Sequence, residues 1–189
     1  MKSLLQRIIF SMIKEHLNIA LLIFCIFLLC GLMGASSSHS AKDADTVRSE
    51  KIFDGDTIGA VVDGRFEKIR LLGIDAPEMD QRPWGKKSRE CLKALISAAD
   101  SRIYIEYDIQ RRDKYGRILA YIWSQDKRML NEEMMEKGCA VLFTFPPNVK
   151  YAARLRAAQK KAQENKTGLW GERGLHESPQ DYRKKHPRK

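Results

Sequence analysis

The sequence predicts an α+β fold that is mainly β, in the form of a small barrel with helices appended to it. Several short stretches alternate apolar and polar residues, as half-buried strands do. Helical patterns interrupt them irregularly, whereas a doubly wound parallel sheet would alternate strand and helix. At 189 residues the chain has room for one such domain with extensions. These three observations favour a barrel of the OB type.

The first 35 residues differ from the rest of the chain. Three cations precede an apolar run over 17–33, and small polar residues follow it. This order is typical of a secretory signal, with cleavage expected near Ala35 or Ser36 and a secreted or periplasmic product. The alternative is an uncleaved anchor that faces outside the cytoplasm, because the run approaches the roughly 18 to 20 apolar residues that can span a bilayer.

The chain is strongly basic, with a net charge of +10. Removal of the leader takes away three cations and one anion, which leaves 10 − 2 = +8. Such a balance in an exported protein suits an anionic polymer such as nucleic acid, although it also suits a membrane surface or solubility alone. Residues 36–46 are predicted to be a linker, and residues 172–189 a solvated basic tail.

Two cysteines remain after the leader, Cys91 and Cys139. They could pair in an oxidising compartment. Cys91, however, lies in a helical pattern beside Leu92 and Leu95, where a buried free cysteine is the commoner outcome, so a free thiol is favoured. No spacing of cysteines and histidines resembles a zinc site.

The first strands are predicted on either side of a turn. The stretch "TIGAVVDGRFEKIRLL" alternates and is split by Asp63-Gly64, a strong hairpin signal because both residues tolerate positive φ. In a two-residue turn, opposed residues have numbers that sum to 127. Thr57 is then opposite Arg70, and Asp56 lies near the end of the second strand.

The remaining elements follow from periodicity. Helical spacing and alternation predict further helices and strands up to about residue 165. The predicted elements are a helix over 86–99, two strands within 101–123, a short helix within 129–138, a short strand within 139–145 and a basic, Ala-rich helix over 149–165.

Two carboxylates, Asp75 and Glu78, follow directly where an apolar strand ends, and the predicted hairpin brings Asp56 close to them. Three acids close together repel one another unless a cation compensates them. Two carboxylates with a backbone carbonyl and water suit calcium or magnesium better than zinc, and the third acid can act on water. The alternative for each acid taken singly is a cap of a turn or a surface ion pair.

A second group of polar residues lies in "DKYGR". Arg117 follows a glycine turn, and Lys114 and Tyr115 lie in the same loop. With Arg70, Arg117 offers two planar donors that could bind a phosphate as it gains negative charge.

Four segments together resemble the signature segments of the thermonuclease (staphylococcal nuclease-like) family, in the same order and at similar spacing. The resemblance implies a domain over 47–171, with five barrel strands and three helices, that acts as a calcium-dependent phosphodiesterase on DNA and RNA and leaves 3′-phosphates. A monomer is expected. The segments are "DGDT" at 54–57, "RLLGIDAPE" at 70–78, "DKYGR" at 113–117 and "NKTGLWG" at 165–171.

The resemblance also implies roles for single residues. Asp56 and Asp75 would hold calcium with the carbonyl of Ala76. Glu78 would activate or orient the attacking water. The other implied residues are Arg70 and Arg117 at the phosphate, Lys114 and Tyr115 at a terminal phosphate, Phe143 and Phe145 near the base, and Asp54 behind the metal ligands.

Some positions depart from the staphylococcal pattern. Ala76 replaces a threonine, which matters little if only its backbone oxygen binds metal. Phe143 and Phe145 stand where tyrosines are found, so stacking is retained and hydroxyl hydrogen bonds are not. The loop 79–85 is also shorter. A noncatalytic OB-fold nucleic-acid-binding module is the main rival function, and the intact set of charged site residues argues against it. A basic envelope-associated scaffold is a third possibility, which predicts no nucleolytic activity and tolerance of charge changes at that set.

Overall fold

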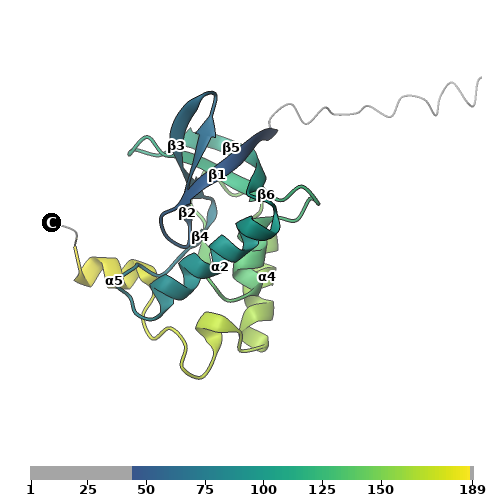
Figure 1. The fold of residues 1–189 in the computed structure, drawn as a ribbon. Helices are drawn as coiled ribbons and strands as arrows, with labels where there is room; N and C mark the ends of the chain where they lie inside the picture. Colours follow the sequence, from purple (N-terminus) through teal and green to yellow (C-terminus); the bar gives the residue numbers. More distant parts are fainter. Residues whose placement is uncertain (1–43, 188–189) are drawn as a thin grey trace, which may run out of the picture. The chain divides into compact units, whose positions relative to one another are not determined.

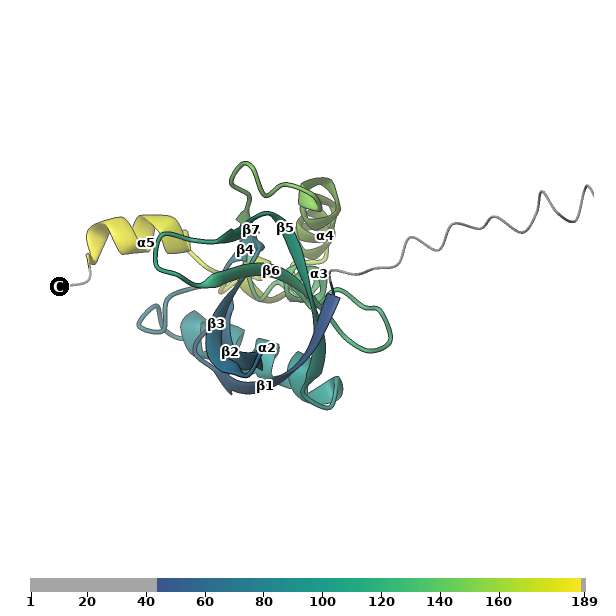
Figure 2. The same ribbon diagram turned by 90° about the horizontal axis from the view of Figure 1, so that it is seen from above.

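Five strands close into a barrel in a computed structural model that describes residues 44–187 (Figures 1 and 2). The order around the barrel is β1-β2-β3-β6-β5. Strands β3 and β6 run parallel, and the other four neighbouring pairs are antiparallel. This architecture confirms the predicted fold class. The barrel strands are β1 (Ala44–Ile52), β2 (Thr57–Val62), β3 (Arg65–Leu71), β5 (Arg102–Arg112) and β6 (Ile118–Trp123).

The hairpin of β2 and β3 has the predicted register. Thr57 pairs with Arg70, and Val62 pairs with Arg65 across the turn. Both turn residues have positive φ, 51° at Asp63 and 75° at Gly64. The backbone N–H of Leu71 donates to the carbonyl of Asp56 at 2.8 Å, which carries the pairing one step beyond β2. The carboxylate of Asp56 is thereby held at the end of β3.

The described helices number four, where the family resemblance implied three. The extra helix, α5, lies in the stretch that was predicted to be a solvated tail, and that prediction was wrong for these residues. The remaining elements are β4 (Gly73–Asp75), α2 (Trp84–Ala98), α3 (Leu130–Glu136), β7 (Val141–Phe143), α4 (Ala152–Glu164), a 3₁₀ turn η1 (Gly168–Trp170) and α5 (Pro179–Lys185).

The core fills the barrel and the space beneath it. Alternating positions of the strands point inward, and α2 crosses one end of the barrel, as the view along its axis shows (Figure 2). Burial of one such side chain contributes about 1.5 to 3 kcal/mol to stability. Among the fully buried side chains are Ile58, Ile69, Leu92, Ile103, Ile105 and Ile122.

Cys91 and Cys139 form a disulfide, with an S–S distance of 2.18 Å. The expectation of a free buried thiol at Cys91 was therefore wrong. The helical pattern was right, since Cys91 lies in α2, but the segment between α3 and β7 returns to α2 and brings Cys139 to it. The bond fixes α2 to the part of the chain that precedes β7.

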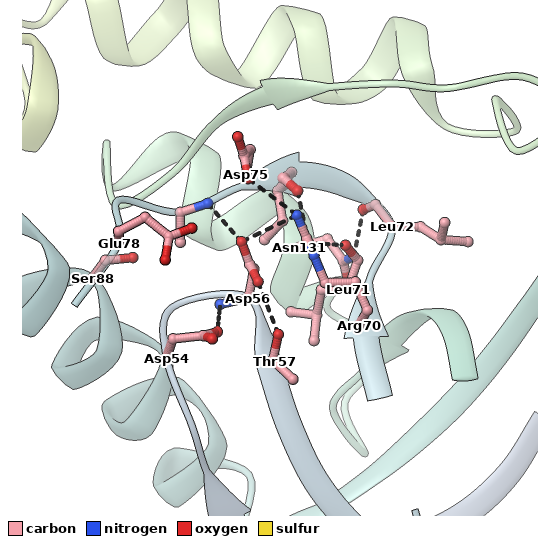
Figure 3. Close-up of polar contacts among 12 residues, drawn as sticks. Asp54, Asp56, Thr57, Arg70, Leu71, Leu72, Asp75, Glu78, Ser88 and Asn131 are labelled. Atoms are coloured by element: carbon pink, nitrogen blue, oxygen red, sulfur yellow. Dashed lines mark hydrogen bonds and ion pairs between the residues drawn. The ribbon is translucent and has the colours of Figure 1, made fainter. Parts of the chain in front are cut away.

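The chain bends at Leu72 between β3 and β4, and one buried side chain holds the bend. Asn131 of α3 donates from Nδ2 to the carbonyl of Leu72 at 2.8 Å. Its Oδ1 accepts from the N–H of Ile122 at 2.9 Å. Asn131 is fully buried, so these bonds satisfy backbone groups that water cannot reach. The bend directs β4 toward the start of β2 (Figure 3).

The predicted leader and most of the predicted linker lie outside the residues that the structure describes. The last linker residues, 44–46, belong to β1, so the linker prediction was wrong for them. Within 44–187, none of the helices is long and apolar enough to cross a membrane.

Candidate active site

Three carboxylates from separate segments lie close together at the end of β3 (Figure 3). Asp56 precedes β2, Asp75 ends β4, and Glu78 lies in the loop that follows β4. In Figure 3 the side chain of Glu78 extends toward Asp56. The convergence predicted from the hairpin register is therefore present in the structure.

Asp56 links the loop before β2 to the loop that follows β4. Its Oδ2 accepts from the N–H of Ala76 at 2.7 Å, and its Oδ1 accepts from the hydroxyl of Thr57 at 3.0 Å. Asp56 is 7 % exposed. Its own N–H donates to Oδ1 of Asp54 at 3.0 Å. Burial, together with the negative charge of Asp56, raises the pKa of Asp54 to about 6.

The approach of these loops to α2 requires glycine at one position. A Cβ at Gly55 would lie 1.9 Å from Oγ of Ser88 and 2.7 Å from Cβ of Ala76. Ser88 is itself fixed, because its hydroxyl donates to the carbonyl of Cys139 at 2.6 Å. The glycine between the two aspartates of "DGDT" thus allows the loop to pack on α2 and on the strand exit.

Arg70 is the cation between Asp56 and Asp75. Its Nη2 lies 3.2 Å from a carboxylate oxygen of each aspartate. Its Nη1 donates to the carbonyls of Leu71 and Ile74, at 2.7 and 2.9 Å. The guanidinium therefore compensates two acids and also braces the bend into β4, a structural role that the sequence analysis did not anticipate.

Asp75 is the most deeply buried of the three acids, with 2 % exposure. Burial raises the pKa of its carboxyl above the usual value, although hydrogen bonds and charge from Arg183 and Arg70 act in the opposite direction. A buried carboxylate of this kind requires a nearby positive charge to remain ionised.

The second cation at Asp75 comes from α5. Arg183 lies 2.6 Å from Oδ2 of Asp75 through Nη2, and its Nη1 donates to Oδ1 of Asp75 at 3.1 Å and to Oε1 of Glu78 at 2.9 Å. The sequence analysis missed this residue. A basic stretch near the end of a chain gives no signal that one of its arginines packs against residues more than a hundred positions earlier.

The donor chemistry of this cluster fits a hard divalent cation. Asp56 and Asp75 each place an oxygen 3.2 Å from one nitrogen of Arg70, so both already face a common positive charge. Among residues 44–187, no three His, Cys, Asp or Glu side chains form a ready ligand set. An ion held by the two aspartates would complete its shell with carbonyl oxygens and water, which suits calcium or magnesium.

The "DKYGR" loop between β5 and β6 is held by contacts among its own residues. Nε of Arg117 lies 2.7 Å from Oδ2 of Asp113, and its guanidinium is 5.7 Å from the ring centre of Tyr115. Nζ of Lys114 is 5.1 Å from the same ring. Burial alone would raise the pKa of Asp113, but hydrogen bonds from Arg117 lower it overall.

Arg117 does not contact the carboxylates, but it precedes the strand that pairs with Arg70. Leu119 is the parallel partner of Arg70, and Arg117 lies two residues before it. Arg117 itself lies just before β6, in the loop at the start of that strand.

The two phenylalanines lie at and just after the end of β7, the strand that pairs with β4. Phe143 of β7 pairs with Gly73, and Asp75 pairs with Val141. Phe143 is 39 % exposed and Phe145 is 71 % exposed. Exposed rings beside the strand that carries Asp75 are available for stacking, but none of the contacts within 44–187 joins either ring to the carboxylates.

The chain is similar in sequence to known proteins. The family model described as "Staphylococcal nuclease homologue" matches residues 68–172. Thermonuclease from Staphylococcus hyicus is 35 % identical over 140 residues, and thermonuclease from Staphylococcus intermedius is 37 % identical over 139 residues. The alignments cover 71 % and 68 % of this chain and 81 % of each relative.

A relative from another genus is also similar. Endonuclease YncB from Bacillus subtilis (strain 168) is 30 % identical over 148 residues, which cover 75 % of this chain and 69 % of the relative. The residues that the family model matches include Arg70, Asp75, Glu78 and Arg117. The chain belongs to the family of staphylococcal nuclease homologues.

Proposed function

We propose that the protein is a calcium-dependent nuclease that hydrolyses phosphodiester bonds of DNA, RNA or both. The observation that carries the proposal is the convergence of Asp56, Asp75 and Glu78 beside Arg70 at one end of the barrel. Membership of a family that includes proteins named thermonuclease and endonuclease supports it. The net charge of +10 suits a polyanionic substrate.

The metal ligands in this proposal are Asp56, Asp75 and the backbone carbonyl of Ala76. Asp54 would hold the loop behind them through its bond to the N–H of Asp56. A bound calcium ion would supply positive charge next to the phosphate and a site for water. The two buried aspartates supply carboxylate oxygens of the kind that calcium prefers.

In the proposed reaction Glu78, Arg70 and Arg117 each have a separate role. Glu78 accepts a proton from the attacking water as the water oxygen bonds to phosphorus. The bond from phosphorus to the 5′ oxygen breaks, that oxygen takes up a proton from solvent water, and Glu78 returns its proton to solvent, which leaves a 3′-phosphate and a 5′-hydroxyl. Arg70 and Arg117 donate hydrogen bonds to phosphate oxygens that gain negative charge, with Arg117 nearer to the leaving oxygen.

Substrate contacts outside this centre are proposed at two places. Lys114 and Tyr115 would bind a terminal phosphate, since both are exposed in the loop beside Arg117. Phe143 and Phe145 would stack on a base. Contacts of this kind hold the backbone or any base face, so little sequence preference is expected.

The experiment that tests the proposal is cleavage of single-stranded DNA, duplex DNA and RNA by the full chain in calcium. Replacement Glu78→Gln removes the proton acceptor and is expected to lower kcat by about 10² to 10⁴. The control Glu90→Gln changes an exposed acid of α2 and should leave kcat unchanged. Full activity of Glu78→Gln, or products with 5′-phosphates, would show that the assignment is wrong.

A noncatalytic nucleic-acid-binding module is the alternative. It predicts that the protein binds these polymers without cleaving them in either calcium or magnesium. The same assay therefore distinguishes the two functions.

A further inference from the structure

The segment that follows η1 ends in α5, which is a defined helix with its own cap. Ser178 precedes it, and the Ser178 hydroxyl accepts from the N–H of Asp181 at 3.1 Å. Pro179 takes the first helical position and is buried. Three basic residues lie in the last turn, where they complement the helix dipole. This geometry is unlike a solvated charged tail.

The start of α5 is attached to the loop between β4 and α2. Nε2 of Gln81 donates to the carbonyl of Glu177 at 2.6 Å, and Gln81 is buried. Next to this bond a pocket of about 460 Å³ separates the residues around Trp84 from Tyr182 of α5. The pocket is lined both by the loop between β4 and α2 and by the segment that ends in α5.

Arg183 is the contact between α5 and the carboxylate cluster. Its two terminal nitrogens bind both oxygens of Asp75, and one of them also donates to Glu78. The paired donors match the two oxygens of a carboxylate, which makes this the stronger class of ion pair. Asp75 is one proposed metal ligand, and Glu78 is the proposed acceptor of the proton from water.

We infer that α5 is an autoinhibitory arm, in which the guanidinium of Arg183 binds Asp75 in place of the divalent cation and also binds Glu78. This inference rests on the proposed function, because it assumes that Asp75 holds a metal ion and that Glu78 acts on water. Calcium and substrate enter the site after α5 moves away from it. If the site is open in only a fraction of the molecules, the apparent dissociation constant of its ligand equals the intrinsic constant divided by that fraction.

Calcium binding by the full chain tests the inference independently of cleavage. Isothermal titration calorimetry with calcium chloride is carried out on the wild type, on Arg183→Gln and on the control Lys184→Gln. Lys184 lies in the same helix, is exposed and pairs with Asp181 of that helix. The dissociation constant of calcium should be at least about tenfold lower for Arg183→Gln than for the wild type. This is the change expected if the closed form of the wild type exceeds its open form about tenfold and the variant is open. Lys184→Gln should bind as the wild type does.

Amide hydrogen exchange provides the second measurement, and it needs no variant. The amides of α5 in the wild type should exchange faster when calcium is saturating than in chelator, because the arm is released. Equal or slower exchange in calcium would overturn the inference.

The outcomes separate this inference from the proposed function. If Arg183→Gln and the wild type bind calcium equally, or the variant binds more weakly, the arm is not inhibitory and the calcium site stands. If neither protein binds calcium, both ideas fail. If calcium affinity is unchanged and cleavage by Arg183→Gln falls a hundredfold, Arg183 contacts the substrate phosphate, which also contradicts an inhibitory arm.

Discussion

Asp75 is the residue at which most charged contacts of the site converge. It receives Arg70 on one oxygen and Arg183 on both, within a position that is 2 % exposed. Three carboxylates and two guanidinium groups therefore share one small volume. Removal of any one of these groups destabilises the fold, because it leaves a buried charge uncompensated. The same arrangement suits a site at which one cation replaces another.

Arg117 gives the clearest prediction at the residue scale. Arg117→Ala should lower kcat/KM by about 10² to 10³, since loss of one donor to a developing charge costs about 2.7 to 4 kcal/mol. Its ion pair with Asp113 is partly exposed, so the melting temperature should change little. Steady-state cleavage and thermal melting measure the two effects.

The matched control for this variant is Arg102→Ala. Arg102 is exposed at the start of β5 and pairs with Asp100. It should retain normal cleavage. Wild-type turnover by Arg117→Ala would remove Arg117 from the site.

The sequence predicted that Asp56 lies near the end of β3, because this placement depends on local rules. Asp63-Gly64 set a two-residue turn, the turn set the register, and the register set Asp56 beside the end of β3. What the sequence did not provide is the contact of Arg183, since nothing local links it to Asp75. The bracing of Leu72 by Asn131 was missed for the same reason.

At the scale of elements, the disulfide joins α2 to the segment before β7. Cys91 and Cys139 are separated by 48 residues. A bond that closes a loop of this size stabilises the folded state by about 2 to 4 kcal/mol, mainly because it restricts the unfolded chain. Reduction of the wild type should lower the free energy of unfolding by that amount in a urea titration.

The double variant Cys91→Ser with Cys139→Ser provides the comparison. It should resemble the reduced wild type and should not respond to reductant. Equal stability of the oxidised and reduced wild type would show that the bond does not contribute.

Tyr121 of β6 gives a prediction about pH. Its ring packs edge-on to Tyr151 with centroids 4.7 Å apart, and its hydroxyl donates to Asp108 at 3.3 Å. Burial, with the negative charge of Asp108, raises the pKa of Tyr121 to about 12. Since the folded state holds the proton more tightly, this contribution to stability is full below pH 10 and is lost as the pH rises through 12.

The size of the effect is up to about 3 kcal/mol, because one pKa unit corresponds to about 1.4 kcal/mol. Urea unfolding at intervals between pH 8 and pH 12 measures it. Tyr121→Phe should lose less stability over this range than the wild type. Parallel curves for the two proteins would contradict the assigned shift.

The limits of element prediction are also physical. The helix over 86–99 was found as α2 because its apolar spacing is regular, and the helix predicted over 149–165 is α4 at Ala152–Glu164. The pairing of Cys91 with Cys139 depends on where α3 and the strand after it return, and this tertiary information is not carried by spacing. The prediction of a free thiol followed the local pattern and was wrong.

At the scale of the whole molecule, a closed barrel presents its strand ends at a rim where distant segments meet. Asp56, Asp75, Glu78 and Arg70 gather at one such place, and α5 lies against it at the side of β3, away from α4 (Figure 2). The fold class could be predicted from short alternating strands. The docking of α5 against this rim could not be predicted, because a basic segment has the same composition whether it is solvated or docked.

Whether Asp75 binds the catalytic calcium is decided by measuring calcium binding and DNA cleavage in the same samples of wild type and Asp75→Asn. The control is Asp126→Asn, because Asp126 is exposed and pairs with Arg128. The wild type should bind calcium and cleave only when calcium is present, Asp75→Asn should lose binding and cleavage together, and Asp126→Asn should keep both. Cleavage by the wild type in excess chelator, or undiminished calcium binding and cleavage by Asp75→Asn, would contradict this role of Asp75.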